Sequence, residues 1–547
     1  MNIDFKKTSV WIPLMVAVAF ASGIILGAKF FSIDISEGQN KLGTVLQYIE
    51  NEYVDKVDTD SLIEKTIPDI LSKLDPHSAY IPASDLQAVN EELDGSFCGI
   101  GIQFNTLNDT ITVLEVISGG PSEKVGIMAG DRIVEINDTV VNTKEWTDTK
   151  IISRLRGPRD TKVKLGVLRA TSPDMLEFEV TRGDIPVASV ESSYMLNPTT
   201  GFIRVSKFGR TTFEEFLNAL VDLRSRGAED YVIDLRGNTG GYMEIAILMA
   251  NEFLPAGKLI VSTHGRDGRA ESMAFSDGNG AFADSRVAVL IDEYSASASE
   301  IFAGAIQDND RGTILGRRSF GKGLVQKQIS LPDSSALRLT TARYYTPSGR
   351  CIQKTYTPGN LDSYGMEIAE RYSHGEGFSA DSAYIDKSVV YHTAGGREVY
   401  GGGGIMPDIF VPNDTTGISS YYINVLNAGM LQRFAFRYAD VNRPRLSEAA
   451  TVDEVESLLP NDDQLLSDFV AFAKKEGGIA PRWYYINLSR DLIVSQLKAL
   501  IARDVLGTSA FYEVINRQDK AVERALEELK NSEPTLNKQA PDTTTVR

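Results

Sequence analysis

Three closely spaced serines stand where a strand is expected to pass into a helix. Residues 287–291 form a short apolar run rich in β-branched residues, which predicts a buried parallel strand. Residues 299–307 have the apolar spacing of a helix, so Ser295, Ser297 and Ser299 fall in the turn between them. The N-terminus of a helix offers free N–H groups and a positive dipole end. A serine nucleophile placed there would have its oxyanion stabilised.

A lysine follows Ser297 after 25 residues (322 − 297). Lys322 can act as a general base only if burial lowers its pKa enough to leave the amine neutral. The neighbouring Gly321 and Gly323 would let the backbone pack closely around it. Gln326 could orient the amine if residues 322–326 form one helical turn. A strand would separate the two residues by about 13 Å and exclude that role.

Each of these features also has an ordinary structural explanation. Ser297 and Glu300 match the S-x-x-E pattern of a capping box, which is common at helix N-termini. A lysine between glycines is typical of an exposed turn. The local residues alone leave both interpretations open, and they do not distinguish among the three serines.

The segments SASASEIFAGAIQD and GRRSFGKGLVQ together resemble the active-site signature of the carboxyl-terminal processing proteases, also called tail-specific proteases. The resemblance implies that Ser297 is the nucleophile, that Lys322 is its base and that Gln326 orients the lysine. It covers about residues 75–412. It further implies a multidomain α/β and β-rich protein, in which a PDZ domain is inserted into or precedes a crotonase-like α/β serine-protease core, with no cofactor and no metal.

A second glycine loop, DLRGNTGG at residues 234–241, joins a predicted strand at 231–235 to a predicted helix at 242–253. It resembles the D-L-R-x-N-x-G-G motif of the same family. Close approach of the backbone requires glycine, so Gly240 and Gly241 are candidates for an oxyanion-binding N–H group. The second donor is expected to be the N–H of Ala298, beside the nucleophile. The sequence does not tell which glycine donates, and a tight turn before a helix is the alternative.

Residues 95–183 are expected to form a separate β-rich module. The run GGPSEKVGIMAGDRIVEINDTVV resembles the helix, turn and strand of a PDZ domain. The loop of Gly99, Ile100, Gly101 and Ile102 should then bind the carboxylate of a peptide C-terminus while the peptide adds a strand to the sheet. Without that resemblance, the glycines would simply mark the entry to a strand. The predicted strands are Ile100–Phe104, Ile111–Val116, Arg132–Ile136 and Val163–Leu168.

The composition and the N-terminal residues limit where the protein works. The net charge of −18 argues against nucleic-acid binding, and two cysteines exclude a disulfide framework. Lys6 and Lys7 precede an apolar run over residues 10–28, which is long enough to cross a bilayer. Its A-x-A match lies in mid-run, which favours an uncleaved anchor over a signal peptide. The basic flank predicts an exported body held at the inner membrane of a bacterial envelope, or a periplasmic protein if the segment is removed.

The remaining chain completes a predicted domain organisation. Residues 356–404 are rich in Gly, Ser and Tyr and are expected to be an inserted loop region. The C-terminal helices carry no chemical motif and suggest a packing or homodimerisation role. The expected boundaries are 1–31 for the anchor, 32–94 for a helical region, 95–183 for the PDZ domain, 184–415 for the catalytic α/β domain, 416–530 for a helical domain and 531–547 for a disordered tail.

Other kinds of catalysis find little support. The histidines His77, His264, His374 and His392 stand in no triad motif, and no G-x-S-x-G elbow surrounds Ser297. No zinc-protease or phosphate-loop motif is present. The sequence therefore predicts a serine endopeptidase that uses a Ser-Lys dyad to cleave exported proteins near apolar C-terminal tails. The alternative is a peptide-binding PDZ scaffold that has lost hydrolysis.

Overall fold

The computed structural model describes Met15, Ala17, Val18 and residues 37–107, 110–117, 119–142, 145–169, 172–383 and 387–531. The chain divides into two compact units, Met1–Lys73 and Leu74–Arg547. In the first unit, helices α2 (Glu37–Glu52) and α3 (Thr59–Leu71) follow the apolar spacing of the sequence. Asp58 caps α3 by accepting a hydrogen bond from the N–H of Ser61.

The two ends of the chain fall largely outside the described residues. The predicted anchor at 1–31 lies outside them apart from Met15, Ala17 and Val18, and the predicted tail lies outside them after Asn531. Among the helices that are described, none combines the length and the apolar character needed to cross a bilayer.

Residues 96–186 form a β-rich module whose main sheet has the strand order β3-β4-β5-β7-β8. Alternate residues of these strands point into one apolar core, where Ile111, Ile133 and Val167 are fully buried. The predicted strand at 100–104 starts only at Ile102, since Gly101 has a φ of +77° and interrupts the extended backbone. The elements are β2 (Ser96–Gly99), β3 (Ile102–Leu107), β4 (Thr110–Val116), α5 (Pro121–Lys124), β5 (Arg132–Ile136), β6 (Thr139–Val140), α6 (Asp148–Leu155), β7 (Lys162–Leu168), β8 (Leu176–Thr181) and β9 (Gly183–Pro186).

The central sheet of the second unit has the order β10-β11-β12-β15-β16-β21. Its strands run parallel from β11 to β21, and β10 is antiparallel to β11. Because β12 and β15 are parallel neighbours, the loops that follow them lie side by side at one sheet edge. The elements are β10 (Val190–Asn197), β11 (Thr200–Val205), α7 (Thr212–Ser225), β12 (Asp230–Asp234), α8 (Met243–Asn251), β15 (Arg286–Ile291), α9 (Ala298–Asp308), β16 (Thr313–Gly316) and β21 (Ile409–Phe410).

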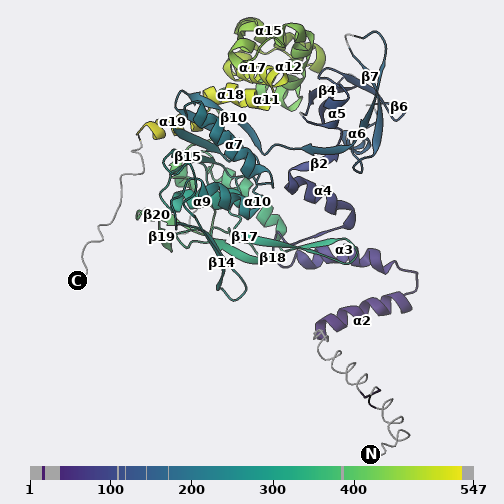
Figure 1. Cartoon of the computed structure of the whole chain (residues 1–547), viewed down its shortest axis with the longest axis vertical. Helices are drawn as coiled ribbons and strands as arrows, with labels where there is room; N and C mark the ends of the chain where they lie inside the picture. The colour runs from purple at the N-terminus through teal and green to yellow at the C-terminus, as the bar shows by residue number, and fades with distance from the viewer. Residues whose placement is uncertain are drawn as a thin grey trace, which may run out of the picture. The chain divides into compact units, whose positions relative to one another are not determined.

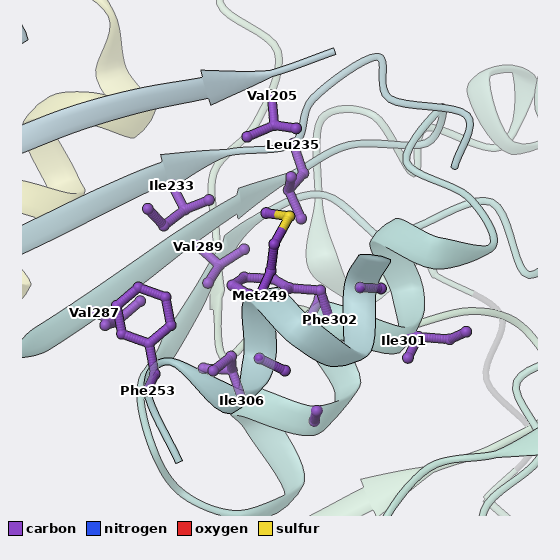
Figure 2. Close-up of a cluster of buried hydrophobic side chains, with 14 of the residues drawn as sticks. Val205, Ile233, Leu235, Met249, Phe253, Val287, Val289, Ile301, Phe302 and Ile306 are labelled. Atoms are coloured by element: carbon purple, nitrogen blue, oxygen red, sulfur yellow. The ribbon is translucent and has the colours of Figure 1, made fainter. Parts of the chain in front are cut away.

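Both faces of this sheet are covered by helices. Val287 and Val289 of β15 point to the face covered by α7, α8 and α9, where they join Met249 and Phe302 in one buried cluster (Figure 2). The alternate residue Leu290 points to the other face and packs against α19 (Lys520–Asn531). Burial on both faces explains why the strand is an unbroken apolar run rather than an alternating one.

A second sheet carries the segment that follows the central strands. Its longest strand, β18, pairs with β1, β13 and β17, and β14 pairs with β13 at the edge. Strand β1 follows Leu74–Ser78, and α4 (Ala83–Asp94) leads from β1 to the β-rich module. The strands are β1 (Ala79–Ile81), β13 (Leu259–His264), β14 (Ala270–Phe275), β17 (Leu324–Ser330) and β18 (Ala336–Tyr345).

The region 356–404, predicted as a loop, contains regular structure, and the prediction is wrong there. Asn360 caps α10 (Leu361–Ser373) by accepting a hydrogen bond from Ser363 N–H, and α10 buries Tyr364 and Arg371. These two residues lie seven positions apart on one helix face, but their polar groups hide the apolar period that marks a helix. A short helix η1 (Ala380–Ser382) and the hairpin of β19 (Val390–His392) and β20 (Glu398–Tyr400) follow.

The C-terminal residues are helical, as their periodicity predicts. They share one apolar core, and Figure 1 shows α12, α15 and α17 side by side in a bundle. The Oγ atoms of Ser509 in α18 and Ser192 in β10 lie 3.0 Å apart, which ties this bundle to the central sheet. The helices are α11 (Ser420–Asn427), α12 (Met430–Val441), α13 (Arg443–Leu446), α14 (Val452–Leu458), α15 (Asp462–Gly477), α16 (Trp483–Leu488), α17 (Arg490–Leu506), α18 (Thr508–Ile515) and η2 (Asn516–Gln518).

Truncation of Phe302 should destabilise the second unit strongly. Its ring is fully buried between α9 and the central sheet, so Phe302→Ala leaves a cavity. We expect the free energy of unfolding to fall by about 3–5 kcal/mol in denaturant titrations. Val221→Ala on the exposed side of α7 is the matched control, because Val221 is 55% exposed and its loss should cost little. Equal effects of the two substitutions would contradict this account of the core.

Candidate active site

The three serines in the turn between β15 and α9 differ in their hydrogen bonds and their burial. Ser295 Oγ donates to the carbonyl of Leu235 at 2.8 Å, and Ser299 Oγ donates to the carbonyl of Asn238 at 2.9 Å. Both serines are completely buried, whereas Ser297 is partly exposed. Ser295 and Ser299 therefore fasten the turn to the glycine loop, and Ser297 is the serine that a substrate can reach.

Ser297 has a strained backbone at the start of α9. Its φ of +57° and ψ of −114° lie in a region that non-glycine residues rarely adopt. Half of the predicted capping box is present, because the carboxylate of Glu300 accepts the N–H of Ser297 at 2.8 Å, whereas the N–H of Glu300 donates to the carbonyl of Ser297 at 2.9 Å. N–H groups in the first turn of α9 therefore bond the Ser297 carbonyl, and the hydroxyl of Ser297 is not used as a cap.

The glycine loop after β12 lies directly against this turn. A Cβ atom on Gly240 would stand 2.7 Å from the Cβ of Ser297 and 3.0 Å from the nitrogen of Ala298, so the position requires glycine. The N–H of Gly240 donates to Asn238 Oδ1 at 2.8 Å. Within the described part of the chain, the N–H groups of Gly241 and Ala298 have no hydrogen-bond partner. These two groups are therefore available to a ligand at Ser297.

Glu300 joins the serine turn to the lysine segment. Its fully buried carboxylate accepts the N–H of Ser297 at 2.8 Å, of Gly321 at 2.7 Å and of Lys322 at 2.9 Å. The hydroxyl of Ser319 also donates to it. Burial raises the pKa of Glu300, while these donors favour the ionised form and oppose the increase. One buried side chain thus fixes the backbone of both predicted catalytic residues.

Tyr344 repeats this connection on the carbonyl side. Its hydroxyl lies 3.1 Å from the carbonyl oxygen of Ser297 and within hydrogen-bond distance of the carbonyl oxygen of Lys322. Tyr344 belongs to β18 and is almost fully buried. The main chains at Ser297 and Lys322 are consequently held together through N–H groups by Glu300 and through carbonyl groups by Tyr344.

Lys322 lies between these contacts, in the Gly-flanked segment that precedes β17. Its Nζ makes no hydrogen bond or ion pair with any of the described residues. Burial lowers the pKa of Lys322 below the ordinary value of lysine, and Arg338 lowers it further, while Glu300 and Asp75 oppose the change. A lowered pKa is what a lysine base requires.

Gln326 does not contact Lys322 through a helical turn, because it lies in a strand, the second of the two alternatives that the sequence left open. Residues 324–330 form β17, because they pair with β18 in an antiparallel ladder. The side-chain amide of Gln326 instead donates to the carbonyl of His77 at 2.8 Å. Any effect of Gln326 on the lysine therefore passes through the turn that contains His77.

That turn is held rigidly beside the lysine. Asp75 accepts the N–H of His77 at 2.8 Å and bonds the side chains of Ser78 and Thr340. His77 Nε2 lies 2.8 Å from the hydroxyl of Tyr364 in α10. Burial and the neighbouring Lys322 lower the pKa of His77 to about 4, so its imidazole is neutral at physiological pH. These contacts give His77 a structural role beside the lysine segment.

Helix α10 supports the lysine segment from the other side. Arg371 donates to the carbonyls of Ser319 at 2.8 Å and Phe320 at 3.0 Å, directly before Gly321 and Lys322. Glu367 pairs with Arg371 at 2.6 Å. Sequence reasoning missed this support, since it depends on contacts across 50 residues of chain that no local pattern encodes.

A separate groove lies in the β-rich module, between β3 and α6. It has a volume of about 410 Å³, and the predicted carboxylate-binding residues Gly99, Ile100, Gly101 and Ile102 line one part of it. Strand β3 pairs with β4 on one side only, so its other edge faces the groove. An extended peptide could pair with that edge. Among the described residues, no group of His, Cys, Asp and Glu side chains is arranged to hold a metal ion.

Comparison with known proteins identifies three matching regions of the chain. Residues 199–361 match the peptidase family S41, residues 98–181 match the PDZ domain, and residues 421–507 match a family of unknown function (DUF8443). A carboxy-terminal-processing protease of Bartonella bacilliformis is 37% identical over 351 residues, which cover 61% of this chain and 80% of that protein. The chain belongs to the carboxy-terminal processing proteases. It is a serine peptidase with a PDZ domain.

Two further similarities concern other members of the family. The carboxy-terminal processing protease CtpA of Bacillus subtilis is 34% identical over 331 residues, which cover 60% of this protease and 70% of the relative. A solved structure of the photosystem II D1 C-terminal processing protease is also similar. The match covers 58% of this protease and 91% of that chain, with 27% sequence identity and a TM-score of 0.33.

Replacement of Glu300 should damage both stability and activity of the protease. Glu300→Gln keeps the size of the side chain but turns one acceptor oxygen into a donor that faces other N–H donors. We expect the free energy of unfolding to fall by about 2 kcal/mol or more, and peptide turnover to fall by about 10²-fold, because both catalytic segments lose their shared support. Glu214→Gln, at an exposed position in the first turn of α7, is the control. A Glu300→Gln protein with unchanged turnover and stability would refute the bridging role.

Proposed function

We propose that the protease cleaves exported proteins near their C-termini with a dyad of Ser297 and Lys322. The observation that carries this proposal is the double connection between the two residues. Glu300 accepts both N–H groups, and the Tyr344 hydroxyl, which donates one hydrogen bond at a time, lies within reach of both carbonyls. The connection brings a partly exposed serine and a lysine of lowered pKa to one place, although 25 residues (322 − 297) separate them. Structural serines and lysines have no need of such an arrangement.

The first chemical step is acylation. Neutral Lys322 takes the proton of Ser297 Oγ as the oxygen attacks a peptide carbonyl, and the carbonyl oxygen becomes an oxyanion. The unpartnered N–H groups of Ala298 and Gly241 bind this oxyanion. Gly240 is the weaker candidate, since its N–H already donates to Asn238. Its role is to let the loop approach Ser297 closely enough for the next N–H to take part.

The second step returns the enzyme to its starting state. Protonated Lys322 gives its proton to the leaving amine, the C–N bond breaks and the acyl group remains on Ser297. Lys322 is then neutral again and activates a water molecule that hydrolyses the ester. No metal and no cofactor takes part in this sequence.

Gln326 acts in this mechanism as a positioning residue. Its amide holds the carbonyl of His77, and the His77 turn lies beside Lys322. This arrangement replaces the direct contact with the lysine that the sequence suggested. Gln326 therefore orients Lys322 indirectly, through the His77 turn, and not by direct contact.

The groove of the PDZ domain serves to select substrates. An extended tail pairs with the free edge of β3, and the N–H groups of Gly99–Ile102 bind its terminal carboxylate. The apolar side chains of Ile102, Ile152 and Leu155 line the groove and favour an apolar C-terminal residue. The inactive-scaffold alternative explains this groove but gives no reason for the connected Ser297 and Lys322.

Several finer proposals rest on the sequence. Export, location in a bacterial envelope and anchoring through residues 1–31 follow from the apolar N-terminal run with its basic flank. The likeness of the core to crotonase, the domain boundaries given above and a homodimer formed through the C-terminal helices likewise stay predictions.

Substitution of either member of the dyad should abolish turnover. Ser297→Ala and Lys322→Ala should each lower turnover of a tail-bearing substrate by at least about 10³-fold, and the double variant should be no worse, because the two residues act as one unit. In the unmodified protease, activity should rise with pH through the lowered lysine pKa, since only the deprotonated amine is a base. Lys322→Arg, which cannot lose its proton, should be inactive throughout.

Lys327→Ala is the control, because this lysine is exposed on β17. Cleavage by folded Ser297→Ala protein at the normal rate would disprove the choice of nucleophile. An unmodified protein that binds tails and cleaves none would support the scaffold alternative.

Recognition of the tail should depend on its terminal charge. Amidation of a substrate peptide removes the carboxylate and therefore the charge-assisted hydrogen bonds to the loop Gly99–Ile102. We expect binding to weaken by roughly ten-fold or more, measured by fluorescence anisotropy with Ser297→Ala protein. The same peptide with a free C-terminus is the control. Equal affinities would show that the groove does not read the carboxylate.

A further inference from the structure

The glycine loop that follows β12 is fastened on two sides. Gly237, Gly240 and Gly241 have φ values of +75°, +103° and +146°, so three residues of the loop do little to restrict its backbone. On one side, the N–H of Gly237 donates to Asp292 Oδ1 at 2.9 Å, in the segment that leads to the serine turn. On the other side, the Arg236 side chain contacts the C-terminal helices. The rigidity of this loop therefore comes from its neighbours.

Arg236 lies between two carboxylates. Its Nε and Nη2 donate to Asp234 at 2.9 and 2.8 Å, and its Nη1 donates to Asp519 Oδ2 at 2.8 Å. The Asp234 side chain is fully buried, and the side chains of Arg236 and Asp519 are only 19% and 21% exposed. Arg204 also donates to the carbonyl of Arg236 at 3.0 Å. The planar guanidinium thus ties Asp519 to the start of the loop with little freedom in either partner.

Asp519 uses its two carboxylate oxygens differently. Oδ1 accepts the N–H groups of Ala521 at 2.8 Å and Val522 at 3.1 Å, and so caps the N-terminus of α19. Capping needs only this oxygen. Oδ2 binds Arg236, which stands five positions (241 − 236) before Gly241. The second oxygen therefore joins the C-terminal helix to the loop that is proposed to bind the oxyanion.

The segment just before Asp519 is bound to the same sheet. The hydroxyl of Tyr512 donates to Glu191 Oε2 at 3.0 Å, and Asn516 Nδ2 donates to the hydroxyl of Tyr194 at 2.9 Å. Glu191 and Tyr194 both belong to β10. Helix α19, which follows Asp519, packs its apolar side chains on the central sheet. Contacts on both sides of Asp519 therefore fix its carboxylate relative to the strands that carry the active site.

We propose that Asp519 is a positioning residue for peptide hydrolysis, which acts through Arg236 to hold the loop that presents the Gly241 N–H to the oxyanion. This inference rests on the proposed function, in which Ser297 is the nucleophile and Gly241 is an oxyanion donor. Such a donor is effective because it is in place before the charge develops. A loop that loses one fastening spends less time with the N–H in that place. The C-terminal helices thereby contribute to catalysis as well as to the core.

Asp519→Ser separates the two uses of this side chain. Serine is a good helix cap, but its single short hydroxyl cannot cap α19 and also reach Arg236. We expect kcat for a tail-bearing peptide to fall about five- to twenty-fold, which is less than the loss of a whole oxyanion donor. KM should change little, because the oxyanion forms only after the substrate has bound. Asp519→Ala should lower kcat equally and also lower Tm, since it removes the cap as well.

Two further variants of the full-length protease assign the effect to the bridge. Arg236→Lys keeps a positive charge beside Asp234 but lacks the planar fork that reaches both carboxylates. Its effect on kcat should not add to that of Asp519→Ser in the double variant, because both substitutions break the same bridge. Leu529→Ala is the matched control, since it removes a buried side chain from α19 ten positions (529 − 519) after Asp519. It should lower Tm and leave kcat unchanged.

The outcomes separate this inference from the function on which it rests. A normal kcat in Asp519→Ser protein would overturn the role of Asp519, and inactive Ser297→Ala protein would at the same time leave the proposed function intact. A raised KM with an unchanged kcat would also overturn it. An equal loss of kcat in Leu529→Ala protein would assign the effect to the packing of α19 and refute the bridge. Normal cleavage by Ser297→Ala protein would instead disprove the proposed chemistry, and this inference with it.

Discussion

The buried carboxylate of Glu300 is the interaction on which the rest of the active site depends. It lies in the first turn of α9, so the helix delivers it to the place where the lysine segment crosses. A buried charge is costly unless donors surround it, and here the main donors are the N–H groups of the segments that carry Ser297 and Lys322. The need to satisfy Glu300 therefore forces Ser297 and Lys322 together. Tyr344, Arg371 and the His77 turn then restrict how the lysine segment can move.

The Glu300 carboxylate also limits how far the pKa of Lys322 can be lowered. Burial and Arg338 lower the pKa of Lys322, while the charges of Glu300 and Asp75 oppose them. The donors that bind Glu300 are backbone N–H groups and the hydroxyl of Ser319, which stabilise its charge without bringing a second cation near the lysine. A side-chain cation in their place would repel a protonated lysine and alter this balance. Uncharged donors therefore hold Glu300 in place without adding a positive charge that would further shift the pKa of Lys322.

Sequence reasoning succeeded where the signal is local. The unbroken apolar run of β15, the helical period of α9 and the turn glycines of the β-rich module encode their own structure. It left Gln326 open between a helical turn and a strand, because pairing with β18 decides between them and no local pattern shows that pairing. It failed at α10, whose buried Tyr364 and Arg371 face a distant segment. The bridging role of Tyr344 had no local signal, since it lies in an ordinary alternating strand.

Helix α19 is synthesised after all the strands of the central sheet, and this order affects when the sheet is fully covered. Its residues Ala521, Val522, Ala525 and Leu529 cover the face of the central sheet opposite α9. Until they leave the ribosome, Leu290 and its neighbours on that face stay exposed to water, and the sheet lacks half of its core. Strand β15 ends at Ile291, 229 residues (520 − 291) before α19 begins at Lys520. The central sheet therefore gains the cover of its second face only when the last helix has been made.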